Sequence, residues 1–98
     1  MMLLTKAIKE KLPKLYSQEH NEDPIVYVKF FNPCGSESWF FTEYDGVNIL
    51  FGKFFSSNCP DGEFGYTSFK EISEVKGRFG IGIERDRSFR PKPLSQCK

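Results

Sequence analysis

Histidine and cysteine are scarce in this 98-residue chain, which holds one histidine and three cysteines. Cys34, Cys59 and Cys97 are odd in number and form no Cys-x-x-Cys pair, so they predict neither a disulfide framework nor a zinc site. If the strands predicted below form a meander, Cys34 and Cys59 lie at one end of the sheet and His20 at the other. We therefore expect no metal and no cofactor, and we expect Cys34 and Cys59 to be free thiols in a reducing cytoplasm.

Long apolar runs are also missing. The N-terminal Met1-Met2-Leu3-Leu4 is soon followed by Lys6 and is too short for a signal peptide. No stretch approaches the roughly 20 apolar residues that a membrane span needs. We expect a soluble, cytoplasmic protein that does not bind membranes. The length favours one domain, and eleven phenylalanines, four tyrosines and one tryptophan predict an aromatic core.

The net charge of +1 shows no large excess of either sign, but the charges are unevenly distributed. Residues 20–69 carry two basic and seven acidic side chains, whereas residues 70–98 carry eight basic and four acidic ones. The region that we predict to form the sheet is therefore acidic, and the C-terminal third is basic.

Short runs of apolar and aromatic residues predict β-strands. The run Ile49–Phe55 is the most apolar, and we expect the rest of the chain to be organised around it. Gly52 in its middle indicates a bulge, or a place where another side chain lies flat on the backbone. Asp45-Gly46 is a hairpin signal that leads into this run, and residues 58–62 form a second predicted turn. The other predicted strands are Ile25–Phe31, Ser38–Tyr44, Glu63–Thr67 and, as a strand or extended segment, Gly80–Glu84.

An N-terminal helix is predicted from Thr5 to Leu12. Leu4, Ile8 and Leu12 recur at helical spacing, and the Thr5 hydroxyl can accept a hydrogen bond from an amide of the first turn. Pro13 disfavours helical backbone at the preceding residue and so ends the helix. We expect this helix to pack its apolar side chains on the sheet. The alternative, a basic helix lying on a membrane, would need more turns.

A second helix is predicted after the fourth strand, because Ser68 and Glu71 form a capping box for a helix that runs to Val75. Two prolines predict an extended tail without regular structure from Arg87 to Lys98. The predicted fold class is α+β, with a mainly antiparallel, strongly twisted sheet of four or five strands. We divide the single domain into an N-terminal helix with its linker, a sheet with its short helix near 69–75, and the tail. These parts span residues 1–19, 25–86 and 87–98.

Several motifs, in order along nearly the whole chain, match one known family. They are Leu4-Thr5-Lys6-Ala7, Leu12–Ser17, Val28–Phe31, Trp39 with Thr42-Glu43, Phe51-Gly52, Gly62–Tyr66, Phe79–Asp86 and Pro91–Leu94. With these motifs the chain resembles the bacterial family catalogued as domain of unknown function 2958. The resemblance implies a gene carried by plasmids, integrative elements and phages. It implies no established activity and no functional residue.

No arrangement of residues in the sequence predicts catalysis. His20 lies in a polar linker without the neighbouring motif that a nucleophile and its base require. Glu84 and Asp86 share one face of a strand, but arginines on the other face explain them as a salt-bridged edge. The glycines of Gly77–Gly82 are in the wrong order for a dinucleotide-binding loop. We therefore expect no enzymatic activity.

Two binding functions remain, and each depends on one charged region. In the first, acidic turns beside exposed aromatic residues bind a protein partner with a basic site, such as an enzyme that handles nucleic acid. The residues of this predicted acidic face are Glu43, Asp45, Asp61 and Glu63. In the second, basic side chains beside aromatic rings bind single-stranded nucleic acid. The residues of this alternative site are Arg78, Arg85, Arg87, Arg90 and Lys92 with Phe89.

The first function is the main hypothesis. It describes a small accessory protein of a mobile element or phage that binds a host or element-encoded protein and inhibits a nucleic-acid-targeting defence of the host. Binding of single-stranded nucleic acid is the alternative, which a pI of about 7.7 disfavours. A third interpretation also remains open, in which the acidic rim only keeps the sheet soluble.

Overall fold

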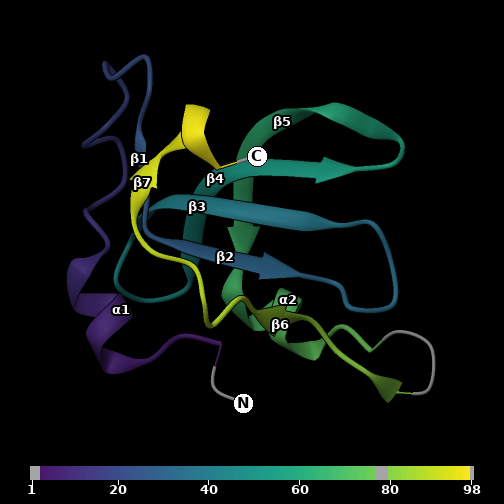
Figure 1. The fold of residues 1–98 in the computed structure, drawn as a ribbon. Helices are drawn as coiled ribbons and strands as arrows, with labels where there is room; N and C mark the ends of the chain where they lie inside the picture. Colours follow the sequence, from purple (N-terminus) through teal and green to yellow (C-terminus); the bar gives the residue numbers. More distant parts are fainter. Residues whose placement is uncertain (1–2, 77–79, 98) are drawn as a thin grey trace.

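The computed structural model describes residues 3–76 and 80–97, and it has the α+β architecture that the sequence predicts. Its main feature is a five-stranded antiparallel sheet with the strand order β5-β4-β3-β2-β6 (Figure 1). The strands are β2 (Val28–Phe31), β3 (Ser38–Tyr44), β4 (Ile49–Ser56), β5 (Cys59–Ser68) and β6 (Glu84–Arg85).

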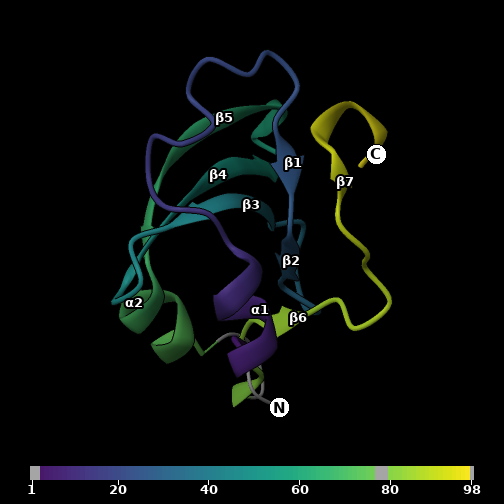
Figure 2. The ribbon, with the colours of Figure 1, turned by 90° about the vertical axis from the view of Figure 1, so that its left-hand side faces the viewer.

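Both predicted helices are present, and each ends one residue earlier than predicted. α1 (Lys6–Lys11) begins after Thr5 and α2 (Phe69–Glu74) begins after Ser68. In each case the hydroxyl oxygen of the capping residue accepts a hydrogen bond from the amide three residues later, at 3.2 Å. Both helices lie below the curved sheet in Figure 2. No helix in residues 3–76 and 80–97 is long and apolar enough to cross a membrane.

One face of the sheet carries the hydrophobic core. Side chains alternate between the two faces along a strand, so Val28, Phe30, Phe41 and Leu50 share this face. The remaining members of the buried cluster come from the N-terminal segment, the end of β3, α2 and the chain before β6. They are Leu4, Leu12, Tyr44, Ile72 and Ile83.

Leu12, at the end of α1, is a strong test of how this helix packs, because only 7 % of it is exposed. The change Leu12→Ala is expected to lower the free energy of unfolding by about 2–5 kcal/mol, through lost burial and the cavity left behind. Lys9→Ala, at an exposed position of the same helix, is the matched control. Urea denaturation measures both, and a wild-type midpoint for Leu12→Ala would show that this end of α1 does not pack on the core.

The central strand of the sheet is β3, and the prediction that the chain is organised around Ile49–Phe55 is wrong. β3 lies between β2 and β4, and its residues 40–44 are all buried. β4 is one strand away from the sheet edge and alternates between buried and half-buried residues over its first half. The most apolar run is therefore the neighbour of the central strand.

Gly52 lies beside a bulge, which confirms one of the two predicted alternatives, but its close neighbour is the backbone of β3 and not a side chain. A Cβ atom at this position would overlap the backbone carbonyl of Phe40 on the adjacent β3. The register of β3 and β4 shifts at Thr42, which is therefore the extra residue of a β-bulge. After the bulge Glu43 pairs with Phe51, so these two side chains lie on the face opposite the core.

Three predicted strands and turns differ in the structure. The predicted strand Ile25–Phe31 is divided at Tyr27 into β1 (Ile25–Val26) and β2, which belong to different sheets. Residues 58–62, predicted to be a turn, mostly belong to β5, which begins at Cys59. Gly62 lies inside this strand with a φ of +80°, where the register of β4 and β5 shifts. Of the segment Gly80–Glu84, predicted to be a strand or extended, only Glu84 belongs to β6, which pairs with Phe30 and Phe31 of β2.

Part of the tail is ordered into short elements, so the prediction that it lacks regular structure is wrong for residues 92–96. β7 (Lys92–Pro93) pairs antiparallel with β1 (Ile25–Val26), and the 3₁₀-helix η2 (Leu94–Gln96) follows it. Ser95 donates hydrogen bonds from its hydroxyl and its amide to the Asp23 carboxylate, at 2.6 and 2.9 Å. These two bonds hold the pKa of Asp23 below its usual value. They fix the tail beside the start of β1.

Candidate functional site

The loop between α1 and β1, residues 12–24, passes over the part of the sheet formed by β3, β4 and β5 (Figure 2). Its start is held by the Tyr44 amide, which donates to the carbonyl of Pro13 at 2.9 Å. The Gln18 side chain holds its middle. The Gln18 Nε2 donates to the carbonyls of Ile25 and Thr42 at 3.0 and 2.9 Å, and its Oε1 accepts from the Ile25 amide at 2.8 Å. The loop is therefore tied to both β1 and β3.

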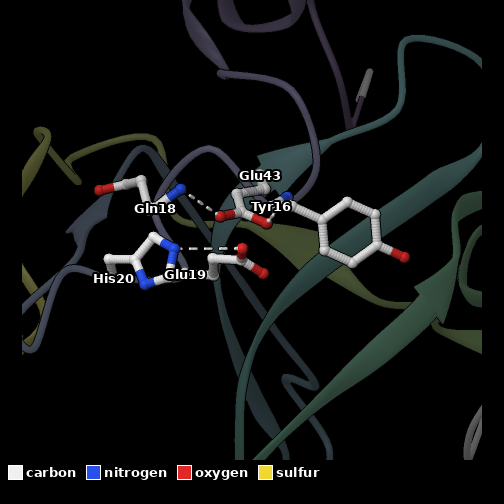
Figure 3. Close-up of polar contacts among 5 residues, drawn as sticks. All are labelled: Tyr16, Gln18, Glu19, His20 and Glu43. Atoms are coloured by element: carbon white, nitrogen blue, oxygen red, sulfur yellow. Dashed lines mark hydrogen bonds and ion pairs between the residues drawn. The ribbon is translucent and has the colours of Figure 1, made fainter.

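Glu43 on β3 is the main anchor of this loop. Its Oε1 accepts a hydrogen bond from the Tyr16 amide at 2.7 Å, and its Oε2 accepts one from the Gln18 amide at 2.8 Å (Figure 3). Hydrogen bonds to an ionised carboxylate are stronger than those between neutral groups. Tyr16 has a φ of 69°, a left-handed conformation that non-glycine residues rarely adopt. The bond to Glu43 helps to hold this conformation.

This arrangement corrects the predicted role of Glu43. We expected its carboxylate on an exposed acidic edge, but Glu43 is only 3 % exposed and both carboxylate oxygens accept backbone hydrogen bonds. The bulge at Thr42 places the side chain on the face that the loop covers. Glu43 is therefore not available as a surface residue for a partner.

Four aromatic rings gather beside Glu43. Phe51 on β4 lies 4.9 Å from Tyr66 and 5.8 Å from Phe64 on β5, measured between ring centroids, and its ring is nearly parallel to that of Phe64. Tyr16 from the loop meets Tyr66 edge-on at 6.5 Å. Tyr16, Tyr66 and Phe64 are 59 %, 56 % and 49 % exposed, which is unusual for large aromatic side chains.

The rings enclose a cavity of about 400 Å³ between the loop and the sheet. We call it the aromatic pocket, and define it by its four rings and three carboxylates. These are Tyr16, Phe51, Phe64 and Tyr66, with Glu19, Glu22 and Glu43.

Three carboxylates line the aromatic pocket, and none of the described residues that line it is a lysine, arginine or histidine. The pocket is therefore negatively charged. The pKa of the Tyr66 hydroxyl is raised, first by a hydrogen bond with the Tyr16 side chain, then by partial burial, and further by the charges of its surroundings, which include Glu43 and Glu19. His20 lies outside the lining. Its Nε2 is 3.4 Å from the Glu19 carboxylate, and its side chain is 96 % exposed (Figure 3).

The other predicted acidic residues do not join Glu43. Asp45 lies in the turn before β4, where its carboxylate accepts hydrogen bonds from three amides, those of residues 47–49, at 2.7–2.9 Å. These bonds lower the pKa of Asp45. Asp61 and Glu63 are exposed on β5, beside the other end of β4. The predicted acidic face is therefore wrong as one surface, because successive hairpin turns lie at opposite ends of an antiparallel sheet.

The predicted basic residues are brought together more closely. Arg85, Arg87 and Arg90 line a second cavity, of about 270 Å³, between α1 and the segment after β6. Phe89 also lines it, and the Nζ of Lys92 lies 5.1 Å from the Phe89 ring centroid. We call these five residues the basic cleft. Arg78, which belonged to the same prediction, lies outside the described residues.

Two of these arginines already have partners within the chain. Arg85 donates to the carbonyl of Leu3 at 3.3 Å, and Arg90 donates to the carbonyls of Arg87 and Phe89 at 3.4 and 3.2 Å. Asp86 also lines the cavity and lies 3.9 Å from the ammonium group of Lys29. Some arginines of the basic cleft are thus already hydrogen-bonded within the chain, and one acidic side chain lines the same cavity.

The family model described as "Protein of unknown function (DUF2958)" matches residues 3–97. The chain belongs to this family. The resemblance inferred from the sequence motifs is confirmed, and the family's description gives no activity. No curated protein and no solved structure matches the chain. The function of this DUF2958 protein must therefore be inferred from its own residues.

Residues 3–76 and 80–97 contain no group of three or more histidine, cysteine, aspartate or glutamate side chains that could hold a metal ion. Cys34, Cys59 and Cys97 form no disulfide. Burial raises the pKa of the Cys97 thiol, which lies 3.5 Å from the carbonyl of Pro93.

Sequence reasoning missed the aromatic pocket. Phe64 and Tyr66 alternate with Gly65, which places both rings on the same face of β5, and this signal was available. Tyr16 lies in a segment that its composition predicts only to be a polar linker. Nothing near it in the sequence indicates that it meets a ring 50 residues later.

Proposed function

We propose that this DUF2958 protein is a small, non-enzymatic accessory protein of a mobile element or phage, and that it binds a protein partner through the aromatic pocket. The observation that carries the proposal is the exposure of three large aromatic side chains around one cavity. Tyr16, Phe64 and Tyr66 are each about half exposed or more. Aromatic residues are enriched at protein interfaces, where their burial supplies much of the binding energy.

The charge of the aromatic pocket supports a partner with a basic surface. Glu19 and Glu22 are exposed beside the rings, and complementary charge favours encounter with a positively charged partner. Enzymes that bind nucleic acid present such surfaces, because they must neutralise phosphates. We therefore propose a cytoplasmic partner of this class, and inhibition of a nucleic-acid-targeting host defence as the role to test first.

Binding of single-stranded nucleic acid is the second candidate, and one observation favours it. The structure brings Arg85, Arg87 and Arg90 to one cavity with the Phe89 ring, as a site for phosphates and a stacked base requires. The engaged arginines and the neighbouring Asp86 weaken this candidate, so it ranks below protein binding.

Paired variants separate the two functions. Phe64→Ala with Tyr66→Ala removes two exposed rings of the aromatic pocket, and Arg87→Glu with Arg90→Glu reverses the basic cleft. Immobilised protein is incubated with host lysate, and retained proteins are compared by mass spectrometry. We expect one partner to be retained by the wild type and by the arginine variant, and to be lost from the aromatic variant.

Circular dichroism and thermal melting show whether each variant is folded. We expect both variants to fold, because all four replaced side chains are exposed. A labelled single-stranded oligonucleotide is titrated in parallel at two salt concentrations. Tight, salt-dependent oligonucleotide binding that the arginine variant loses would favour the second candidate. Retention of the same partner by the aromatic variant would contradict the first.

A further inference from the structure

We propose that the aromatic pocket takes the guanidinium group of an arginine side chain of the partner protein. This inference rests on the proposed function and names the chemistry that the pocket recognises. A planar cation matches the pocket in two respects, because flat rings line it and its charged lining groups are all carboxylates.

The same face of the sheet already has one cationic side chain of this protein, Lys53, close to two aromatic rings. The ammonium group of Lys53 lies 5.4 Å from the ring centroid of Phe55 and 5.3 Å from that of Phe64. Phe64 is also a wall of the aromatic pocket, and Phe51 lies nearly parallel to it at 5.8 Å. The Lys53 contacts show that rings on this face lie at distances suited to cation–π interaction.

The carboxylates supply the complementary charge. Glu43 closes the inner end of the pocket as a buried, hydrogen-bonded anion, and its neighbours in the described lining include no basic side chain. Glu19 and Glu22 are exposed, so their oxygens remain accessible to the donors of a guanidinium group.

Other ligands fit these groups less well. A nucleotide would stack on the rings, but its phosphate would be repelled by the carboxylates. A neutral aromatic ligand would leave the carboxylates unused. A lysine side chain is positively charged, but its ammonium group is not planar and is more strongly hydrated than a guanidinium group. Arginine uses the rings for stacking and the carboxylates for hydrogen bonds.

Two short peptides test the inference on the intact protein. They are acetyl-Gly-Arg-Gly-amide and the same peptide with citrulline, which keeps the shape of arginine but is neutral. Each is titrated into ¹⁵N-labelled protein and followed by chemical shifts. We expect the arginine peptide to shift the amides of Tyr16, Gln18 and Tyr66 and to bind about tenfold more tightly than the citrulline peptide.

Matched variants show which groups are responsible. Glu19→Gln with Glu22→Gln removes two charges at the pocket, whereas Glu10→Gln with Glu74→Gln removes two exposed charges on α1 and α2. The first pair is expected to reduce the preference for arginine over citrulline. The second pair is expected to leave it unchanged.

Several results would overturn the inference. They are equal binding of the two peptides, absence of binding by both, shifts confined to the basic cleft, and an oligonucleotide that competes for the aromatic pocket. Failure of the inference is distinct from failure of the proposed function. If partner capture depends on Tyr66 but the arginine peptide does not bind, only the inference fails. If the arginine peptide binds but capture does not depend on Tyr66, the proposed function fails.

Discussion

Replacing Gly52 with alanine is expected to prevent folding, or to remove most of the stability of the domain. The new Cβ would overlap the carbonyl of Phe40 and lie 2.7 Å from the Cα of Phe41. Both atoms belong to the backbone of β3, which is paired with β2 on its other side and cannot move without breaking that ladder. We expect a loss above about 4 kcal/mol, against a total of about 5–15 kcal/mol for a typical domain.

Gly65 provides the matched control, because it lies directly opposite Gly52 in the β4–β5 ladder. A Cβ at Gly65 would have no atom within 4 Å. The change Gly65→Ala is therefore expected to leave stability unchanged, or to raise it by up to about 1 kcal/mol through the lower entropy of the unfolded chain. Soluble yield and urea denaturation measure both variants. A Gly52→Ala protein with the wild-type midpoint would show that β3 and β4 are not this close.

The features that the sequence predicted correctly depend on neighbouring residues. Thr5 and Ser68 each cap a helix through an amide three residues away, and Asp45 organises its turn through amides two to four residues away. The alternation within β2 also depends only on which side chains follow one another. Such signals are contained in a few consecutive residues, so the type and approximate position of most elements could be predicted.

The features that were missed depend on contacts between distant residues. Nothing in the run Ile49–Phe55 shows that β3 rather than β4 is central, because sheet order is decided by which strands pair. Residues 92–93 form a strand only because residues 25–26 lie beside them. Pro91 and Pro93 led us to predict an irregular segment, and they cannot indicate that Ser95 binds Asp23.

Glu43 shows why the site could not be predicted. Between Thr42 and the turn at Asp45, an acidic residue is typical of an exposed strand end, and we predicted it so. Its burial requires the bulge at Thr42 and a loop that begins more than 25 residues earlier. The two remote amides that satisfy its carboxylate belong to a segment with no strand or helix signal of its own.

The loop over the sheet and the aromatic pocket depend on the same residue. Glu43 fixes the backbone of Tyr16 and Gln18, and Tyr16 brings its ring to Tyr66. The rings of Phe51, Phe64 and Tyr66 are placed by β4 and β5 and need no loop. A change at Glu43 should therefore displace the Tyr16 ring and remove the buried charge of the pocket. The other three rings should stay in place.

The change Glu43→Ala is expected to release the loop and to abolish binding of the partner and of the arginine peptide, with the sheet intact. The amides of Tyr16 and Gln18 lose a charged acceptor, which costs about 1.5–3 kcal/mol for each bond. Tyr16 also loses the contact that holds its left-handed backbone. Glu43→Gln keeps one acceptor oxygen but places a donor against a backbone amide, so an intermediate loss is expected.

Hydrogen exchange distinguishes release of the loop from global unfolding. In Glu43→Ala the amides of Tyr16 and Gln18 should exchange much faster than in the wild type, whereas the amides of Phe30 and Leu50 in the core strands should remain protected. Glu63→Ala, which removes an exposed acid from β5, is the control and should change neither exchange nor binding. If the Tyr16 amide stays protected in Glu43→Ala and partner binding persists, the pocket does not depend on this anchor.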